Sequence, residues 1–217
     1  MTGKRVDMTD PIGCETLIGM LQAAAAQIRG HHEELSRLDS FGGDGDHGAT
    51  MLRAVRRVED AAAGGAARTP AKLLEDVGWA IMGVDGGATG PLLGSLFTGM
   101  AEAAGDAQSL DCRRLAAAFE AGSAAVGRRT KAQAGDKTML DALLPAVAAF
   151  RESAEAGASV SDALARAAAA AAAGAAATAG MQARCGRAKH LGARSVGQQD
   201  PGAKSIALMF KGFAEGV

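Results

Sequence analysis

Residues 39–50 read Asp-Ser-Phe-Gly-Gly-Asp-Gly-Asp-His-Gly-Ala-Thr, and the motifs in the rest of the chain can be related to this stretch. It holds three carboxylates, Asp39, Asp44 and Asp46, among glycines that reach backbone conformations other residues avoid. Three carboxylates brought within about 4 Å repel by roughly 4 kcal/mol per pair at an effective dielectric near 20, and a bound cation removes that repulsion. Because carboxylate ligands favour hard ions, the stretch predicts a Mg²⁺ or Ca²⁺ site rather than a zinc site.

A helix is expected directly after the last of these aspartates, over residues 48–63. The free N–H groups at a helix N-terminus bind anions. A cation site beside an anion site indicates a metal-bound phosphate. The helix is predicted from four apolar residues that share one face: Met51, Leu52, Val55 and Val58.

Two simpler interpretations compete for residues 39–47, here called the aspartate loop. Loops rich in glycine and aspartate are most often ordinary turns. An EF-hand is excluded, because the twelfth position counted from Asp39 or Asp44 is Thr50 or Val55 and not the required glutamate. The full spacing Asp-x4-Asp-x-Asp-His-Gly, running into a helix, favours the metal site.

Composition narrows the class of protein. The chain has 217 residues, a formal net charge of −1 and 3% aromatic residues with no tyrosine, which argues against a nucleic-acid partner. No composition break divides it, so a single domain over 1–217 is expected. No secretory signal is found before the first expected helix. The three distant cysteines fit neither a zinc motif nor a disulfide framework, which indicates reduced thiols in a cytoplasm.

The alanine-rich tract before Gly180 contains Arg166 and is predicted as a packed helix, not a membrane span.

Helical periodicity recurs along the chain, and no segment alternates as a strand does. The sequence therefore predicts an all-α barrel or bundle of eight antiparallel helices. Thr69 and Asp200 precede prolines, as N-caps do, and Asp136 is expected to cap the sixth helix. The expected helices cover about 11–34 and 48–63, begin at Pro70 and Pro91, and cover about 109–128, 138–154, 159–180 and 201–214.

Element order also predicts where a site lies. Successive antiparallel helices place alternate loops at the same end, so loops 39–47, 83–90, 129–137 and 181–200 should meet there. The glycines of 83–90 fit either an ordinary turn or backbone approach to a phosphate, with the Thr89 hydroxyl as a donor. Gly-Asp-Lys-Thr at 135–138 lacks the strand and spacing of a Walker A motif. Lys131 and Lys137 are expected as solvated charges, or as neutralisers of a nearby phosphate.

Four stretches, one from each loop, together resemble the nucleotide-binding L subunit of bacterial dihydroxyacetone kinases, and the similarity extends over nearly the whole chain. The resemblance implies a barrel of eight antiparallel helices with ADP or ATP at its rim. The matching stretches are G-D-G-D-H-G at 43–48, G-G-A-T-G-P-L-L-G at 86–94, K-A-Q-A-G-D-K-T-M-L-D-A at 131–142, and G-R-A-K-H-L-G-A-R-S-V-G-Q-Q-D-P-G-A at 186–203.

The resemblance also implies roles for individual residues. Two Mg²⁺ ions would be held by Asp39, Asp44 and Asp46. The phosphates would be met by His47, Gly48, Ala49, Thr50, Ala88 and Thr89, and the rest of the nucleotide by Thr130, Met139, Arg187, Asp200, Pro201 and Gly202. The chain departs from the usual family pattern at Thr130, at Lys189-His190 and at Gln198, in loops that cover the nucleotide or face partners.

By this resemblance the chain transfers a phosphoryl group to dihydroxyacetone, or a related short ketose, held on a partner K subunit. The phosphoryl source is left open between exchange of ATP and rephosphorylation of bound ADP by a phosphotransferase-system M subunit. The alternative is a non-catalytic nucleotide- or lipid-binding regulatory module. The sequence also leaves a homodimer open.

Overall fold

The computed structural model describes residues 11–63 and 69–217, and these residues fold into helices and loops with a single β-bridge between Ile12 and Leu110. The all-α class is therefore confirmed for the described residues. The α-helices are α1 Cys14–Gly30, α2 His32–Ser40, α3 His47–Ala62, α4 Pro70–Met82, α5 Thr89–Ala104, α6 Cys112–Arg129, α7 Leu140–Glu155, α8 Val160–Ala177 and α9 Pro201–Glu215, with 3-10 helices η1 Thr178–Gly180 and η2 Arg187–Ser195.

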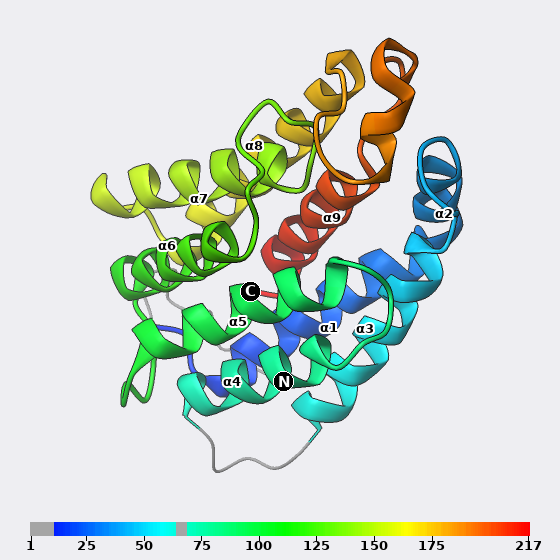
Figure 1. Ribbon diagram of the computed structural model, residues 1–217. Helices are drawn as coiled ribbons and strands as arrows, with labels where there is room; N and C mark the ends of the chain where they lie inside the picture. The colour runs from blue at the N-terminus through cyan, green and yellow to red at the C-terminus, as the bar shows by residue number, and fades with distance from the viewer. Residues whose placement is uncertain (1–10, 64–68) are drawn as a thin grey trace.

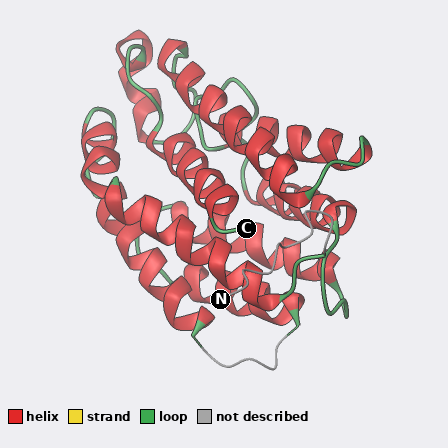
Figure 2. Cartoon of the chain, turned by 180° about the vertical axis from the view of Figure 1, so that it is seen from behind, coloured by secondary structure: helices red, strands yellow, loops and turns green. Residues whose placement is uncertain are grey.

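Eight of these helices close into a ring (Figure 1). From α3 to α9 each helix packs on the next, α9 packs on α1, and α1 packs on α3. Figure 2 shows the helices from behind, connected by loops. The closed ring confirms the predicted eight-helix barrel, and α2 extends from it beside α3 and α9.

The first predicted helix, 11–34, is wrong in both extent and continuity. The chain instead forms α1 and then α2, because His31 leaves helical geometry with φ −120° and ψ 11°. Its ring nitrogen Nδ1 lies 2.8 Å from the Gln27 carbonyl oxygen, and Gly30 before it is a poor helix former. Since α2 continues to Ser40, Asp39 lies in the last turn of a helix and not in a loop as expected.

Side-chain caps start several helices as predicted. The Thr69 hydroxyl accepts a hydrogen bond from the Lys72 N–H at 3.2 Å, and the Asp200 carboxylate accepts one from the Ala203 N–H at 2.7 Å. The prediction that Asp136 caps the sixth helix is wrong. There α7 begins at Leu140, and the carboxylate of Asp141 accepts hydrogen bonds from the loop that precedes it.

The alanine-rich tract forms α8, as predicted. Every fourth residue from Ala163 to Ala175 is buried, and Gly174 lies so close to Asp141 that a side chain there would overlap its backbone. Small residues thus let α8 pack closely on α7, the helix that follows loop 129–137. Among the described residues, no helix is long and apolar enough to span a membrane.

The barrel interior is filled by side chains. Phe119, Phe150 and Phe210 are fully buried, with ring centroids 5.1 and 5.3 Å from Phe119. An apolar cavity between α1, α3 and α9 has a volume of about 30 Å³. An engineered protein cavity of about 150 Å³ binds benzene, so this one, at a fifth of that volume, is too small for an acyl chain.

Candidate functional site

An open cleft lies at one end of the barrel, where the four predicted loops meet. Its lining residues fall within 38–51, 86–93, 137–139 and 185–205. Each range includes or borders one of the four loops singled out by element order, so the prediction that these loops share one end of the barrel is confirmed. The four sequence motifs therefore contribute to one cavity.

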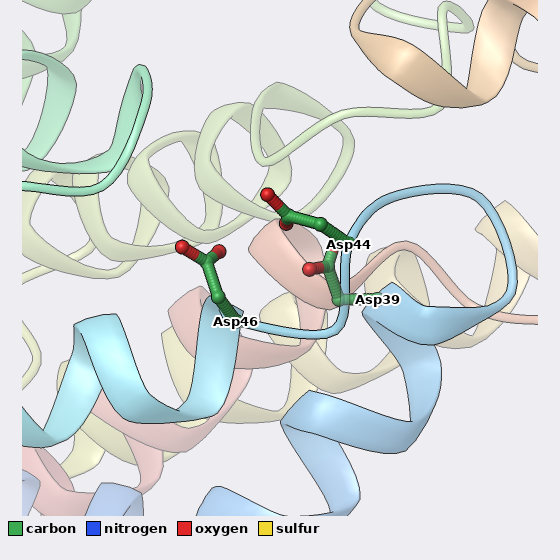
Figure 3. Close-up of side chains that lie close together, drawn as sticks. All are labelled: Asp39, Asp44 and Asp46. Atoms are coloured by element: carbon green, nitrogen blue, oxygen red, sulfur yellow. The ribbon is translucent and has the colours of Figure 1, made fainter.

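Three carboxylates gather at the edge of the cleft, and two of them, Asp39 and Asp46, line it (Figure 3). Asp39 lies at the end of α2, Asp44 in the loop, and Asp46 directly before α3; an oxygen of each lies within 4.8 Å of an oxygen of the others. A divalent ion with ligands at about 2.0–2.6 Å fits between oxygens at such separations. The donor set is all oxygen and all anionic, which suits Mg²⁺ or Ca²⁺.

The aspartate loop is held in place by Asp39 at both of its ends. The Asp39 carbonyl accepts hydrogen bonds from the N–H groups of Gly42 at 3.1 Å and Gly43 at 2.6 Å, and its carboxylate accepts one from the His47 N–H at 3.3 Å. Gly45 has φ +78°, a conformation that glycine adopts without strain. The loop therefore converges on Asp39 through contacts between near neighbours in sequence.

The opposite wall is basic. Arg187 forms an ion pair with Asp44, and both side chains are about half exposed. The hydrogen bond from Arg187 lowers the pKa of the Asp44 carboxyl. In this arrangement the guanidinium neutralises part of the charge that a metal ion would otherwise neutralise.

His47 connects the starts of three helices. Its Nε2 lies 2.8 Å from Ser205 Oγ on α9, and its Nδ1 lies 3.4 Å from Thr89 Oγ1 on α5. Because the Ser205 hydroxyl donates to the Pro201 carbonyl at 3.0 Å, it accepts from Nε2–H, and Nδ1 is then free to accept from Thr89. Burial lowers the pKa of His47, against the raising effect of Asp39 and Asp46, so the ring is neutral near pH 7.

Three helix N-termini face the cleft. The first residues of α3, α5 and α9, which are His47, Thr89 and Pro201, all line it. The dipole of each helix favours an anion at these positions, and α3 and α5 add free N–H groups, whereas α9 starts with a proline and is capped by Asp200. The carboxylate cluster therefore lies next to these helix starts, and the cation site beside an anion site stays a prediction.

Ten of the fifteen predicted site residues line the cleft, and five do not. Thr50 is buried behind Gly86, where a side chain would overlap it, and its hydroxyl accepts from Arg53 at 2.8 Å. Thr130 accepts from the Ala132 N–H at 3.1 Å. Lining residues are Asp39, Asp46, His47, Ala88, Thr89, Met139, Arg187, Asp200, Pro201 and Gly202; those outside the lining are Asp44, Gly48, Ala49, Thr50 and Thr130.

Several lining residues were not singled out from the sequence as site residues. Phe41, Leu92 and Met51 add apolar surface, and Ser205 orients His47. Ser205 follows Pro201 by one helical turn, which is a signal that could have placed it on the cleft side of α9. The two expectations for Lys137 are wrong: its Nζ is neither solvated nor free for a phosphate, because it donates to backbone carbonyls.

Asp200 has a perturbed acidity. Burial raises its pKa to about 7, Asp141 adds to the increase, and the Ala203 N–H and Lys137 oppose it. The side chain thus caps α9 while lining the cleft. A pKa near 7 means that this carboxyl gains or loses its proton close to neutral pH.

Comparison with known proteins identifies the family. A family model described as the DAK2 domain matches residues 42–215. The ADP-binding subunit DhaL of the PEP-dependent dihydroxyacetone kinase of Escherichia coli K12 is 41% identical over 179 residues, covering 82% of this chain and 85% of that subunit. This chain belongs to the DhaL family. A DhaL subunit of Listeria innocua is 35% identical, over 85% of this chain and 87% of its own length.

A solved relative shares the DhaL fold. The dihydroxyacetone kinase from C. freundii, crystallised with AMP-PNP and Mg²⁺, superposes with a TM-score of 0.73 and 27% identity. The match covers 99% of this chain and 36% of that kinase chain, so the DhaL fold corresponds to about a third of the larger protein.

Proposed function

We propose that this chain, acting as one domain, is the nucleotide-binding subunit of a dihydroxyacetone-type kinase. It would pass a phosphoryl group from a magnesium-bound nucleotide to dihydroxyacetone, or a related short ketose, held on a partner K subunit. The observation that carries the proposal is the cluster of three carboxylates at the edge of a cleft that three helix N-termini line. Its relatives are named as kinase subunits that bind ADP.

The carboxylates fit the metal that this function requires. Asp39, Asp44 and Asp46 would hold two Mg²⁺ ions, which supply charge neutralisation for the phosphoryl oxygens. Arg187 pairs with Asp44, and because both side chains are about half exposed, a bound cation would replace this pair at little cost. Arg187 would then be available to the phosphates on the same side of the cleft.

The chain's own groups orient the rest of the nucleotide. The N–H groups at the starts of α3 and α5 would hold phosphate oxygens. Neutral His47 would hold these two starts beside α9 through its contacts with Thr89 and Ser205. Apolar side chains of Phe41, Leu92 and Met139 would contact the base or ribose, in a site without tyrosine.

We further propose that the nucleotide remains bound as ADP and is rephosphorylated in place by a phosphotransferase-system protein. Both bacterial relatives are named as subunits of PEP-dependent enzymes. Exchange of bound ADP with labelled ATP separates the two sources: slow exchange supports rephosphorylation in place, and exchange within one turnover contradicts it. A lipid-binding role is disfavoured by the small interior cavity.

Reconstitution tests the function directly. The purified chain is mixed with candidate K subunits, Mg²⁺, a panel of short ketoses, and either ATP or ADP with PEP and phosphotransferase-system proteins. Ketose phosphate should form only when chain, K subunit and Mg²⁺ are all present. Phosphorylation at the same rate without this chain would contradict the proposal.

A further inference from the structure

One wall of the cleft is formed by residues 181–200, here called the cover segment. It contributes Arg187, Ser195 and Gln198 to the lining. Within it the chain forms only the 3-10 helix η2, which Gly192 interrupts with φ +56°. Short 3-10 turns have poor hydrogen-bond geometry, so the cover segment depends on contacts with other elements to keep its place.

Lys137 supplies such contacts from the loop between α6 and α7. Its Nζ donates to the carbonyls of Met181 at 3.2 Å, Ser195 at 2.6 Å and Gln198 at 2.6 Å. One acceptor lies at the start of the cover segment and two lie near its end, and Lys137 is only 6% exposed. An ammonium group has three donors, and here all three reach the same segment.

The backbone at Lys137 is strained to make this contact. Among the described residues it is the one residue other than glycine with positive φ, at +62°. The turn is fixed by Asp141, whose carboxylate accepts from the N–H groups of Gly135 at 2.5 Å and Thr138 at 2.7 Å. Such strain persists where surrounding contacts determine the conformation, and it concentrates at ligand clamps.

The preceding residue fastens the same segment. The Asp136 carbonyl accepts from the Arg184 N–H at 3.1 Å, and its carboxylate accepts from the Cys185 thiol at 3.7 Å. Two consecutive residues of one loop therefore hold the wall of the cleft across more than forty positions in sequence. In Figure 1 this loop and the cover segment lie side by side above α9.

We propose that Lys137 is a positioning residue that fastens the cover segment over the cleft and thereby sets how long a nucleotide stays bound. The part that concerns nucleotide rests on the proposed function. Displacing the cover segment would separate a buried ammonium from three carbonyls, and leaving such groups unpaired is costly. The cover segment should therefore move rarely while Lys137 is present.

The contact is specific for an ammonium group. Three acceptors arranged around one nitrogen suit the compact –NH₃⁺ of lysine, whereas a guanidinium is planar and spreads its donors in a fork. Lys137→Arg should therefore not restore the contact, although it keeps the charge. This separates fastening by geometry from a general effect of positive charge on phosphate.

The test measures the cover segment and the nucleotide separately. Amide hydrogen exchange is followed in the nucleotide-free chain, and release of mant-ADP is followed after a chase with excess ADP and Mg²⁺. The variants are Lys137→Met, Lys137→Arg, and Lys137→Gly, which keeps the positive φ without strain. Lys211→Met, an exposed lysine paired with Glu215 on α9, is the control for loss of one charge.

Lys137→Met and Lys137→Gly should each speed both exchange within 181–200 and mant-ADP release by about tenfold or more, the effect expected for losing charge-assisted hydrogen bonds. Exchange in α5 and α9 should not change, and Lys211→Met should match wild type. Wild-type rates in Lys137→Met, or in Lys137→Arg, would overturn the proposal. So would failure of both Lys137→Met and Lys137→Gly to fold, because Lys137 would then support the whole barrel.

The two proposals fail in different ways. If the wild-type chain binds no mant-ADP, the proposed function fails, and hydrogen exchange still decides whether Lys137 fastens the cover segment. If the wild type binds mant-ADP and the variants release it at the wild-type rate, the role of Lys137 in nucleotide residence fails alone.

Discussion

The two walls of the cleft are built in different ways. The aspartate loop is acidic, lies between two helices, and is held by Asp39 through neighbours at most eight positions away. The cover segment is basic and irregular, and it is held by Lys137 from a loop more than forty positions earlier. The first wall has local support suited to a fixed metal site, and the second depends on a long-range contact.

The largest expected effect is on the acidic wall. Asp46→Asn should reduce phosphoryl transfer in the reconstituted system by about a thousandfold or more, because a metal ligand is lost. The helical fold should remain, since the Asp46 side chain makes no capping hydrogen bond to α3. Transfer rate and circular dichroism are the measurements. Asp85→Asn, at an exposed carboxylate outside the cleft lining, is the matched control and should keep full activity.

The second prediction concerns the turn that carries Lys137. Asp141→Ala should lower the free energy of unfolding by about 3 kcal/mol, because two loop N–H groups lose their acceptor. Asp111→Ala removes the single cap bond of α6 and should cost about 1 kcal/mol. Urea denaturation of both variants measures the two decreases in the free energy of unfolding. Equal decreases would mean that Asp141 acts only as an ordinary cap.

The third prediction is a pH dependence. The folded pKa of Asp200, about 7, lies above its unfolded value of 3.8, so the folded chain binds the proton more tightly. Its contribution to stability is complete below pH 3.8 and is lost as pH rises towards 7. Between pH 5 and 6.5 the loss should be about 2 kcal/mol.

Urea unfolding across this range tests the dependence. Asp200→Asn keeps a side-chain acceptor for the Ala203 N–H and should remove the slope. An unchanged slope in that variant would assign the dependence to another group.

The smallest effect is expected where the two walls touch. Arg187→Gln removes an ion pair whose partners are about half exposed, and exposed pairs contribute little to stability. The thermal midpoint of the metal-free chain should not shift measurably. A clear decrease would show that this contact, and not Lys137, holds the cover segment.

The sequence was sufficient for the parts of the molecule that depend on local pattern. Apolar periodicity and caps such as Thr69 and Asp200 predicted most of the helices. The order of the elements predicted that four loops lie at one end of the barrel. The break at His31 was missed, because a glycine and a side-chain contact to the Gln27 carbonyl are too weak a signal against continuous periodicity. The same error placed Asp39 in a loop.

Long-range contacts account for the other differences between the sequence analysis and the structure. Thr50 was expected at the phosphates, yet the approach of Gly86 from a distant loop covers it. Lys137 was expected to be solvated or to face a phosphate, and its three acceptors lie 44 to 61 positions away. The spacing of residues along the chain does not predict such contacts, because they form only when the helices pack together.

Calorimetric titration with ADP tests the central claim most directly. The wild-type chain and Asp46→Asn are each titrated with ADP in Mg²⁺ and again in EDTA. If the carboxylates hold the metal that holds the nucleotide, the wild type should bind ADP tightly only with Mg²⁺, and the variant should bind weakly in both conditions. Equal affinity of wild type and variant, or tight binding in EDTA, would contradict the account.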